Sequence, residues 1–138
     1  MSILNLQTIR YLNLLDQTSR VQTRTCFIYN NTIFFAVPSY LVSRAIGPNS
    51  INIRLLQEKL GKRIKIIRTA KGINDAERFI RDIIAPVTFK SLEINDRIIF
   101  LNSGSMQNKA SLIGRDKRRL SELSLITRDI FNMDLKIV

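Results

Sequence analysis

The chain has 138 residues, of which 45% are apolar, and its 22 lysines and arginines exceed its 11 acidic residues to give a net charge of +11. It has no histidine and one cysteine, Cys26, which excludes an internal disulfide, the usual zinc sites and histidine-based catalysis. We therefore expect a non-enzymatic protein without metal or cofactor, whose excess of cations is typical of a nucleic-acid partner.

The N-terminal residues lack the basic region and apolar core of a secretion signal. No apolar run approaches the ~20 residues that a membrane-spanning helix needs. These features predict a cytoplasmic protein with no membrane partner. As the chain is expected not to be an enzyme, we also expect no small-molecule substrate.

The first elements predicted along the chain are a helix and a β-hairpin. Residues 7–15 carry a broad apolar stripe that is compatible with a helix docked on a sheet. Residues 21–29 and 32–37 are rich in β-branched and aromatic residues, and Asn30-Asn31 between them suits a two-residue hairpin turn.

A pair of helices and a strand follow. Pro38 is placed to open a helix that Gly47 ends, and Ser50 is a good N-cap for a second helix that Gly61 terminates. Residues 63–67 then predict a closing strand.

The same order of elements begins again near residue 70. Asn74 and Glu77 have the spacing of a capping box for a helix that Pro86 ends. The elements expected after it are two strands at 87–94 and 97–101 joined by Asn95-Asp96, a helix at 106–113, a turn at Gly114, a helix to about residue 132, and a strand at 135–138.

The step Ile46-Gly47 recurs as Ile113-Gly114, 67 positions later. Gly47 and Ile64 are 17 residues apart, whereas Gly114 and Leu135 are 21 apart. The difference of four is about one helical turn, so the last helix of the second copy should be longer. The sequence therefore predicts an α+β protein of two similar domains, 1–70 and 71–138, each with the order α-β-β-α-α-β.

Each glycine turn joins two helices, and the N–H groups and dipole at the start of the second helix favour an anion such as a phosphate. Ile46, Ile51 and Ile53 around the first turn can offer an apolar surface to unstacked bases, which suits a single strand better than a duplex. The alternative for Ile46 and Ile53, as for Ile113 and Leu120 in the second copy, is packing in the core.

Two segments, Ile46-Gly47-x-x-Ser50-x-x-Ile53 and Ile113-Gly114-x-x-Lys117-x-x-Leu120, resemble the Ile-Gly-x-x-Gly-x-x-Ile core of KH domains, and the order of elements is similar to the type II KH topology. Three further segments resemble the archaeal NusA-like transcription factors, which are tandem KH proteins: Ala45-Ile46-Gly47-Pro48-Asn49, Leu60-Gly61-Lys62-Arg63-Ile64 and Ile84-Ala85-Pro86-Val87. The resemblance implies two tandem type II KH domains, each a three-stranded sheet packed by helices.

The resemblance also implies two RNA-binding loops, and both depart from the family pattern. Ser50 and Lys117 replace the second glycine, Pro48 removes an N–H donor, and Asp116 adds a carboxylate where a phosphate should approach. In the second loop the surrounding cations can outweigh Asp116, or the loop geometry can be lost, and both outcomes stay open here. The RNA-binding residues expected are Arg44, Ile46, Gly47, Pro48, Asn49, Ser50, Ile53, Arg54, Lys62, Arg63 and Lys65 in the first copy, and Lys109, Gly114, Arg115, Lys117, Arg118 and Arg119 in the second.

Residues 1–70 contain ten basic and two acidic residues, whereas residues 71–138 contain twelve and nine. This excess on the side of the first loop favours a binding groove over a merely solvated basic face. The resemblance implies a single-stranded RNA-binding factor in transcription termination or elongation control, with RNA polymerase or other transcription proteins as candidate partners. The alternatives are a structural component of a ribonucleoprotein, such as a ribosome-associated KH protein, and a protein-interaction module built on a degenerate second copy.

Overall fold

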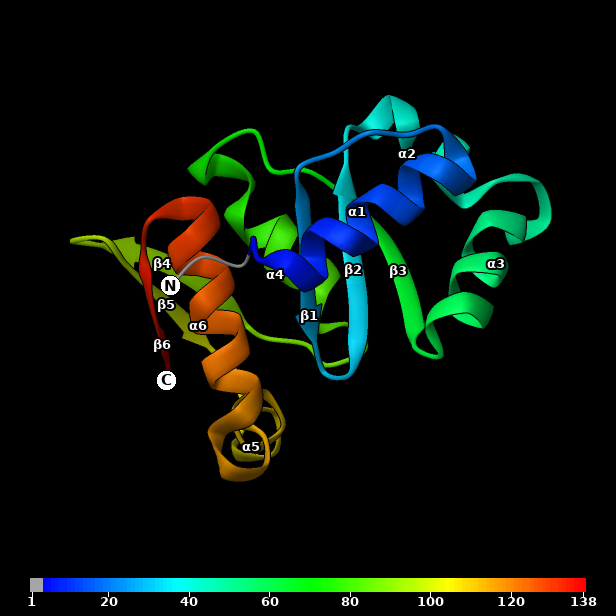
Figure 1. Cartoon of the computed structure of the whole chain (residues 1–138). Coiled ribbons are helices and arrows are strands. Elements are labelled where there is room, and N and C mark those ends of the chain that lie inside the picture. Colours follow the sequence, from blue (N-terminus) through cyan, green and yellow to red (C-terminus); the bar gives the residue numbers. More distant parts are fainter. Residues whose placement is uncertain (1–3) are drawn as a thin grey trace. The chain divides into compact units, whose positions relative to one another are not determined.

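A computed structural model describes residues 4–138, and within it the chain divides into two units between Thr69 and Ala70 (Figure 1). Each unit is α+β and contains one three-stranded sheet, so the predicted class is confirmed. Residues 1–3, which belong to the first predicted domain, lie outside the described residues. No helix in the described part of the chain is both long enough and apolar enough to cross a bilayer.

The first unit has the predicted order of elements. They are α1 (Leu6–Ser19), β1 (Thr25–Tyr29), β2 (Thr32–Val37), α2 (Val42–Ile46), α3 (Ile51–Leu60) and β3 (Arg63–Arg68), with short 3-10 turns at Ser39–Leu41 and Pro48–Ser50. Strand β2 pairs antiparallel with β1 and parallel with β3. Asn30 and Asn31 both have positive φ, 49° and 62°, which confirms the predicted hairpin turn.

Local sequence explains where the helices of this unit begin and end. Asn5 and Thr8 form a reciprocal capping box in front of α1, and Gly61 ends α3 with a left-handed φ of 65°. Helix α2 starts later than predicted, because Pro38 opens the 3-10 turn at residues 39–41 and the α-helix follows it.

The helices of the first unit pack on one face of its sheet. Fully buried side chains from α1, α2 and α3, such as Leu15, Ala45 and Leu56, meet Ile33 and Phe35 of β2 in one apolar core. Each large side chain buried in this way contributes about 1.5–3 kcal/mol to stability. The core thus holds α2, α3 and the turn between them at a defined place over the sheet.

The second unit repeats this arrangement. Its elements are α4 (Ala76–Ile84), β4 (Ser91–Asn95), β5 (Ile98–Asn102), α5 (Met106–Ile113), α6 (Arg118–Phe131) and β6 (Asp134–Ile137), with 3-10 turns at Ile73–Asp75 and Arg115–Lys117. Strand β5 pairs antiparallel with β4 and parallel with β6. Helix α6 has 14 residues and α3 has 10, so the predicted extra turn of four residues is confirmed.

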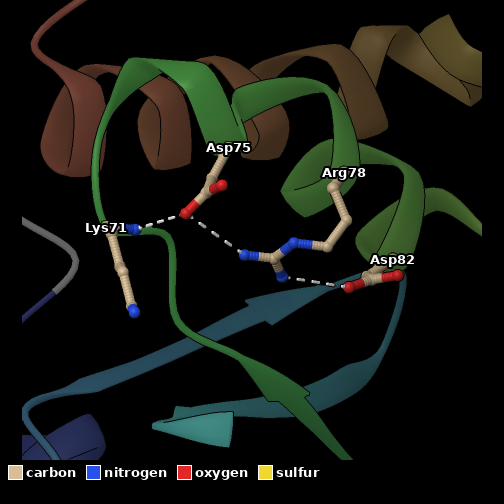
Figure 2. Close-up of polar contacts among 4 residues, drawn as sticks. All are labelled: Lys71, Asp75, Arg78 and Asp82. Atoms are coloured by element: carbon tan, nitrogen blue, oxygen red, sulfur yellow. Dashed lines mark hydrogen bonds and ion pairs between the residues drawn. The ribbon is translucent and has the colours of Figure 1, made fainter.

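The capping box predicted at Asn74 and Glu77 is wrong. Helix α4 is preceded by a 3-10 turn that starts at Ile73, so Asn74 lies within that turn and not at an N-cap. Asp75 secures this region instead: its Oδ2 accepts the Lys71 N–H at 2.8 Å and lies 3.6 Å from Arg78 Nη2 (Figure 2).

The second hairpin also differs from its prediction. Strand β4 begins at Ser91 and not at residue 87, because the Val87 N–H donates to Ile84 in a turn that follows α4. Asn95 pairs with Ile98, so Asp96 and Arg97, with φ of 51° and 62°, form the turn one residue later than expected.

Candidate nucleic-acid interface

The first glycine loop has a tightly specified backbone. The Gly47 N–H donates to Ser43 at 2.9 Å and ends α2, and the φ and ψ of Gly47, 80° and 162°, lie in a region that only glycine adopts readily. Asn49 (54°, 30°) and Ser50 (59°, 30°) follow in the left-handed region, and the Ser50 N–H donates to the Gly47 carbonyl at 3.1 Å.

The second loop has the same conformation in spite of its different side chains. Gly114 (74°, 174°), Asp116 (55°, 28°) and Lys117 (58°, 24°) match their counterparts 67 positions earlier, and the Lys117 N–H donates to Gly114 at 3.2 Å. Of the two outcomes that the sequence left open for this loop, loss of its backbone geometry is not the one observed.

Ser50 stands at the N-cap position of α3, but the capping bond predicted for it is wrong. Its left-handed backbone is not the extended conformation of a capping serine, and its side chain makes no capping bond. The turn also offers fewer free donors than expected, because the N–H groups of Ser50 and Ile51 are bonded to Gly47 and Pro48. Side chains must therefore provide much of the contact with any bound anion.

Two apolar side chains of α3 are exposed beside the first loop. Ile51 is 46% exposed and Leu55, one turn further on, is 41% exposed. Ile53 packs against the core, and Ile46 is half-buried. Leu55 was not predicted, although its spacing of four from Ile51 places the two on one face of a helix.

The structure brings only some of the predicted cations to the first loop. Arg54 Nη2 donates to the Asn49 carbonyl at 2.8 Å, and Arg44 is exposed in the last turn of α2. Lys62 and Arg63 follow the opposite end of α3, where β3 begins (Figure 1), about 15 Å from the loop for a helix of 10 residues.

Lys65 is also directed away from the loop. Its neighbours Ile64 and Ile66 face the helices, so Lys65 points to the opposite face of the sheet, where its Nζ lies 5.8 Å from the centre of the Phe34 ring. Lys62, Arg63 and Lys65 therefore do not join Arg44 and Arg54 in one cluster.

The second loop is richer in exposed cations. Arg115, Lys117 and Arg118 are exposed within or directly after the turn, and Lys109 is half-buried one helical turn before Gly114. Among residues 4–138, the carboxylate of Asp116 has no ion-pair partner. The turn and the start of α6 thus carry three exposed cations and one exposed carboxylate.

The sequence did not point to Asn52, which contributes to the first loop. Its Nδ2 donates to the Arg44 carbonyl at 3.1 Å, and the counterpart of Asn52 in the second loop is Arg119, whose Nη1 donates to the Ser111 carbonyl at 3.1 Å. The 67-residue offset aligns the two positions, but their side chains differ so much that sequence alone does not suggest a shared contact.

No protein-family model matches the chain. A protein of Halococcus morrhuae named probable transcription termination protein NusA is 21% identical over 128 residues, which cover 91% of this chain and 90% of that protein. The protein of the same name from Methanocaldococcus jannaschii is 22% identical over 139 aligned positions, covering 98% of this chain and 74% of its own length. The resemblance to archaeal NusA-like proteins is thereby confirmed along most of the chain.

A solved structure supports the fold. The crystal structure of APE1850 matches with a TM-score of 0.68 at 23% identity, covering 98% of this chain and 100% of that one. The two proteins therefore share a fold.

Proposed function

We propose that this archaeal NusA-like chain is a transcription-associated protein that binds single-stranded RNA through two tandem type II KH domains, 1–70 and 71–138, and acts in termination or elongation control. One observation carries the proposal: two glycine loops at equivalent places in two similar units have the same backbone conformation and are flanked by exposed cations. The names of the two curated relatives support the link to transcription.

In this proposal phosphates of the strand lie along each loop. Exposed cations of each loop neutralise these phosphates: Arg44 and Arg54 in the first unit, and Arg115, Lys117 and Arg118 in the second. Each unit would hold about four nucleotides.

The bases in the first unit would lie against Ile51 and Leu55, which are exposed one turn apart next to the loop. Bases paired in a duplex are stacked and turned inward, so they cannot use this surface. This is the reason for proposing a single strand.

Titration of a short, unstructured, fluorescently labelled RNA and of a blunt duplex, followed by anisotropy, tests the proposal. The single strand should bind more tightly. Substitution of Arg44 and Arg54 by Gln, or of Arg115 and Lys117 by Gln, should weaken binding and reduce the magnitude of the log–log salt slope by about 1.4, since each phosphate contact to a single strand contributes about 0.7.

Matched controls are the exposed cations Arg24 in the first unit and Lys90 and Lys136 in the second, none of which lies in a glycine loop. If these Gln variants lose as much affinity as the loop variants, binding is not directed by the loops. Tighter binding of duplex or folded RNA would favour a structural ribonucleoprotein role. The transcriptional role is tested separately, by the effect of the wild-type chain and its loop variants on termination in a transcription reaction with the cognate polymerase.

A further inference from the structure

The same side-chain contact closes both glycine loops, although the donors are different residues. Asn52 Nδ2 donates to the Arg44 carbonyl, and Arg119 Nη1 donates to the Ser111 carbonyl, each at 3.1 Å. In both loops the donor lies five residues after the glycine and the acceptor three residues before it. We call this contact the loop clamp.

The clamp satisfies a carbonyl that the helix end leaves without its usual partner. In a continuing helix, Arg44 would accept a bond from residue 48, which is Pro48 and has no N–H. Ser111 would accept from Arg115, but the chain leaves the helical path at Gly114, whose φ is 74°. A side chain from the next helix supplies the missing donor in each case.

The clamp also occupies the space beside the glycine. A Cβ on Gly47 would lie 2.8 Å from Asn52 Nδ2, and a Cβ on Gly114 would lie 2.9 Å from Arg119 Cγ. Clamp and glycine are therefore packed against one another, and the clamp ties the start of the second helix to the end of the first.

We infer that Asn52 and Arg119 are positioning residues that hold the two loops in their binding conformation, and that Arg119 also adds charge to its loop. A guanidinium has five N–H donors, and the clamp uses one of them, whereas the Asn52 amide is neutral. The part of this inference that concerns RNA affinity rests on the proposed function, but the part that concerns loop conformation does not.

Reciprocal exchange tests the clamp. Asn52→Arg and Arg119→Asn each install a donor that the other loop already uses at the same backbone position, so both should preserve the loop. Asn52→Ala and Arg119→Ala remove the donor, and exchange of the Ser50 or Lys117 N–H should become roughly five- to tenfold faster, as expected for the loss of one hydrogen bond. Amide exchange and backbone chemical shifts measured by NMR on the full chain report this directly.

RNA binding gives an independent readout. Asn52→Ala should weaken binding of a short single-stranded RNA although no charge is lost, and Asn52→Arg should bind at least as tightly as wild type. Asn13→Ala and Arg118→Ala are matched controls, because both side chains are exposed and neither contacts a loop carbonyl. Arg118→Ala should lower affinity without changing the loop amides.

Unchanged amide exchange rates and chemical shifts of the loops in both Ala variants would overturn the inference. So would a result in which Asn52→Arg and Arg119→Asn perturb the loops as much as the Ala substitutions do. If an Ala variant does not fold, Asn52→Arg and Arg119→Asn still test whether a donor at this position preserves the loop. Perturbed loops in a chain whose wild type binds no RNA would uphold the clamp and reject the proposed function.

Discussion

At the scale of single residues, the loops contain backbone strain at the positions where the family pattern has a second glycine. Ser50 and Lys117 have φ of 59° and 58°, a conformation that costs a residue with a Cβ roughly 1–2 kcal/mol. Glycine avoids this cost but loses more entropy on folding, by about 0.5–1 kcal/mol. Substitution of Ser50 or Lys117 by glycine should therefore be neutral to mildly stabilising.

We expect Ser50→Gly and Lys117→Gly to raise the free energy of unfolding by up to about 1 kcal/mol, measured by urea denaturation. Ser121→Gly, at an exposed helical position of α6, is the control and should lower it by about 0.5 kcal/mol. Destabilisation by Ser50→Gly or Lys117→Gly similar to that of the control would contradict the assigned strain.

The first glycine of the loop is required for two reasons, its backbone conformation and the space beside it. Gly47→Ala should lower the free energy of unfolding by about 2–4 kcal/mol, since it combines a φ of 80° with contact to Asn52. Gly61→Ala is the comparison for an ordinary left-handed glycine: its φ and ψ are 65° and 24°, and a Cβ there meets nothing within 4 Å, so it should cost only about 1 kcal/mol. Equal losses, measured by urea denaturation, would show that neither the ψ of 162° at Gly47 nor its packing against Asn52 adds to the cost.

Cys26 gives the first unit a predictable response to alkaline pH. The side chain is 1% exposed, and burial raises the pKa of the thiol from 9.0 to about 12. Above pH 9 the unfolded chain releases this proton while the folded chain retains it, so the thiol makes stability fall as pH rises toward 12.

Relative to neutral pH, we expect this thiol to lower the free energy of unfolding by about 1.4 kcal/mol at pH 10. The difference in stability between wild type and Cys26→Ala, measured by denaturation from pH 7 to 10.5, isolates the effect from the titration of tyrosines and lysines. A difference that does not change with pH would mean that the thiol ionises equally in both states.

At the scale of elements, the start of α4 depends on Asp75 (Figure 2). One carboxylate oxygen accepts the Lys71 N–H at 2.8 Å and approaches Arg78, whose Nη1 lies 3.4 Å from Asp82 Oδ2 near the other end of the helix. The hydrogen bond to the backbone fixes the turn, whereas the partly exposed ion pairs contribute little.

Asp75→Ala should therefore lower the free energy of unfolding by about 1 kcal/mol, and amide exchange at Lys71 should become faster. Asp75→Asn keeps an acceptor oxygen and loses only charge, so it should cost less than half as much. Equal effects of the two substitutions on a thermal melt would assign the stabilisation to charge and not to the hydrogen bond.

At the scale of the whole molecule, the net charge of +11 predicts strongly salt-dependent binding. If about 4 to 6 phosphates of a single strand are neutralised, the log–log salt slope should be on the order of −3 to −4. The first unit has a net charge of +8, from ten basic and two acidic residues, but Lys62, Arg63 and Lys65 lie away from its loop. A titration without salt dependence would contradict a phosphate-binding role.

The order of elements, the first hairpin turn, the two glycine turns and the extra helical turn in α6 could all be predicted from sequence. Each depends on interactions between near neighbours, such as the 3.6-residue period of an apolar face or the freedom of glycine to adopt positive φ. The similarity to archaeal NusA-like proteins was likewise visible in short contiguous motifs.

Only the tertiary structure decided which cations accompany each loop and what holds the loops in place. Lys62 and Lys65 add to the positive charge of the first unit, so the sequence grouped them with its loop. In the structure Lys62 follows the far end of α3, and Lys65 points to the opposite face of the sheet. The loop clamp joins the side chain of one helix to a carbonyl of another, with Asn52 in one unit and Arg119 in the other. Such contacts depend on where two elements meet in space, and no local pattern of residue types encodes that meeting point.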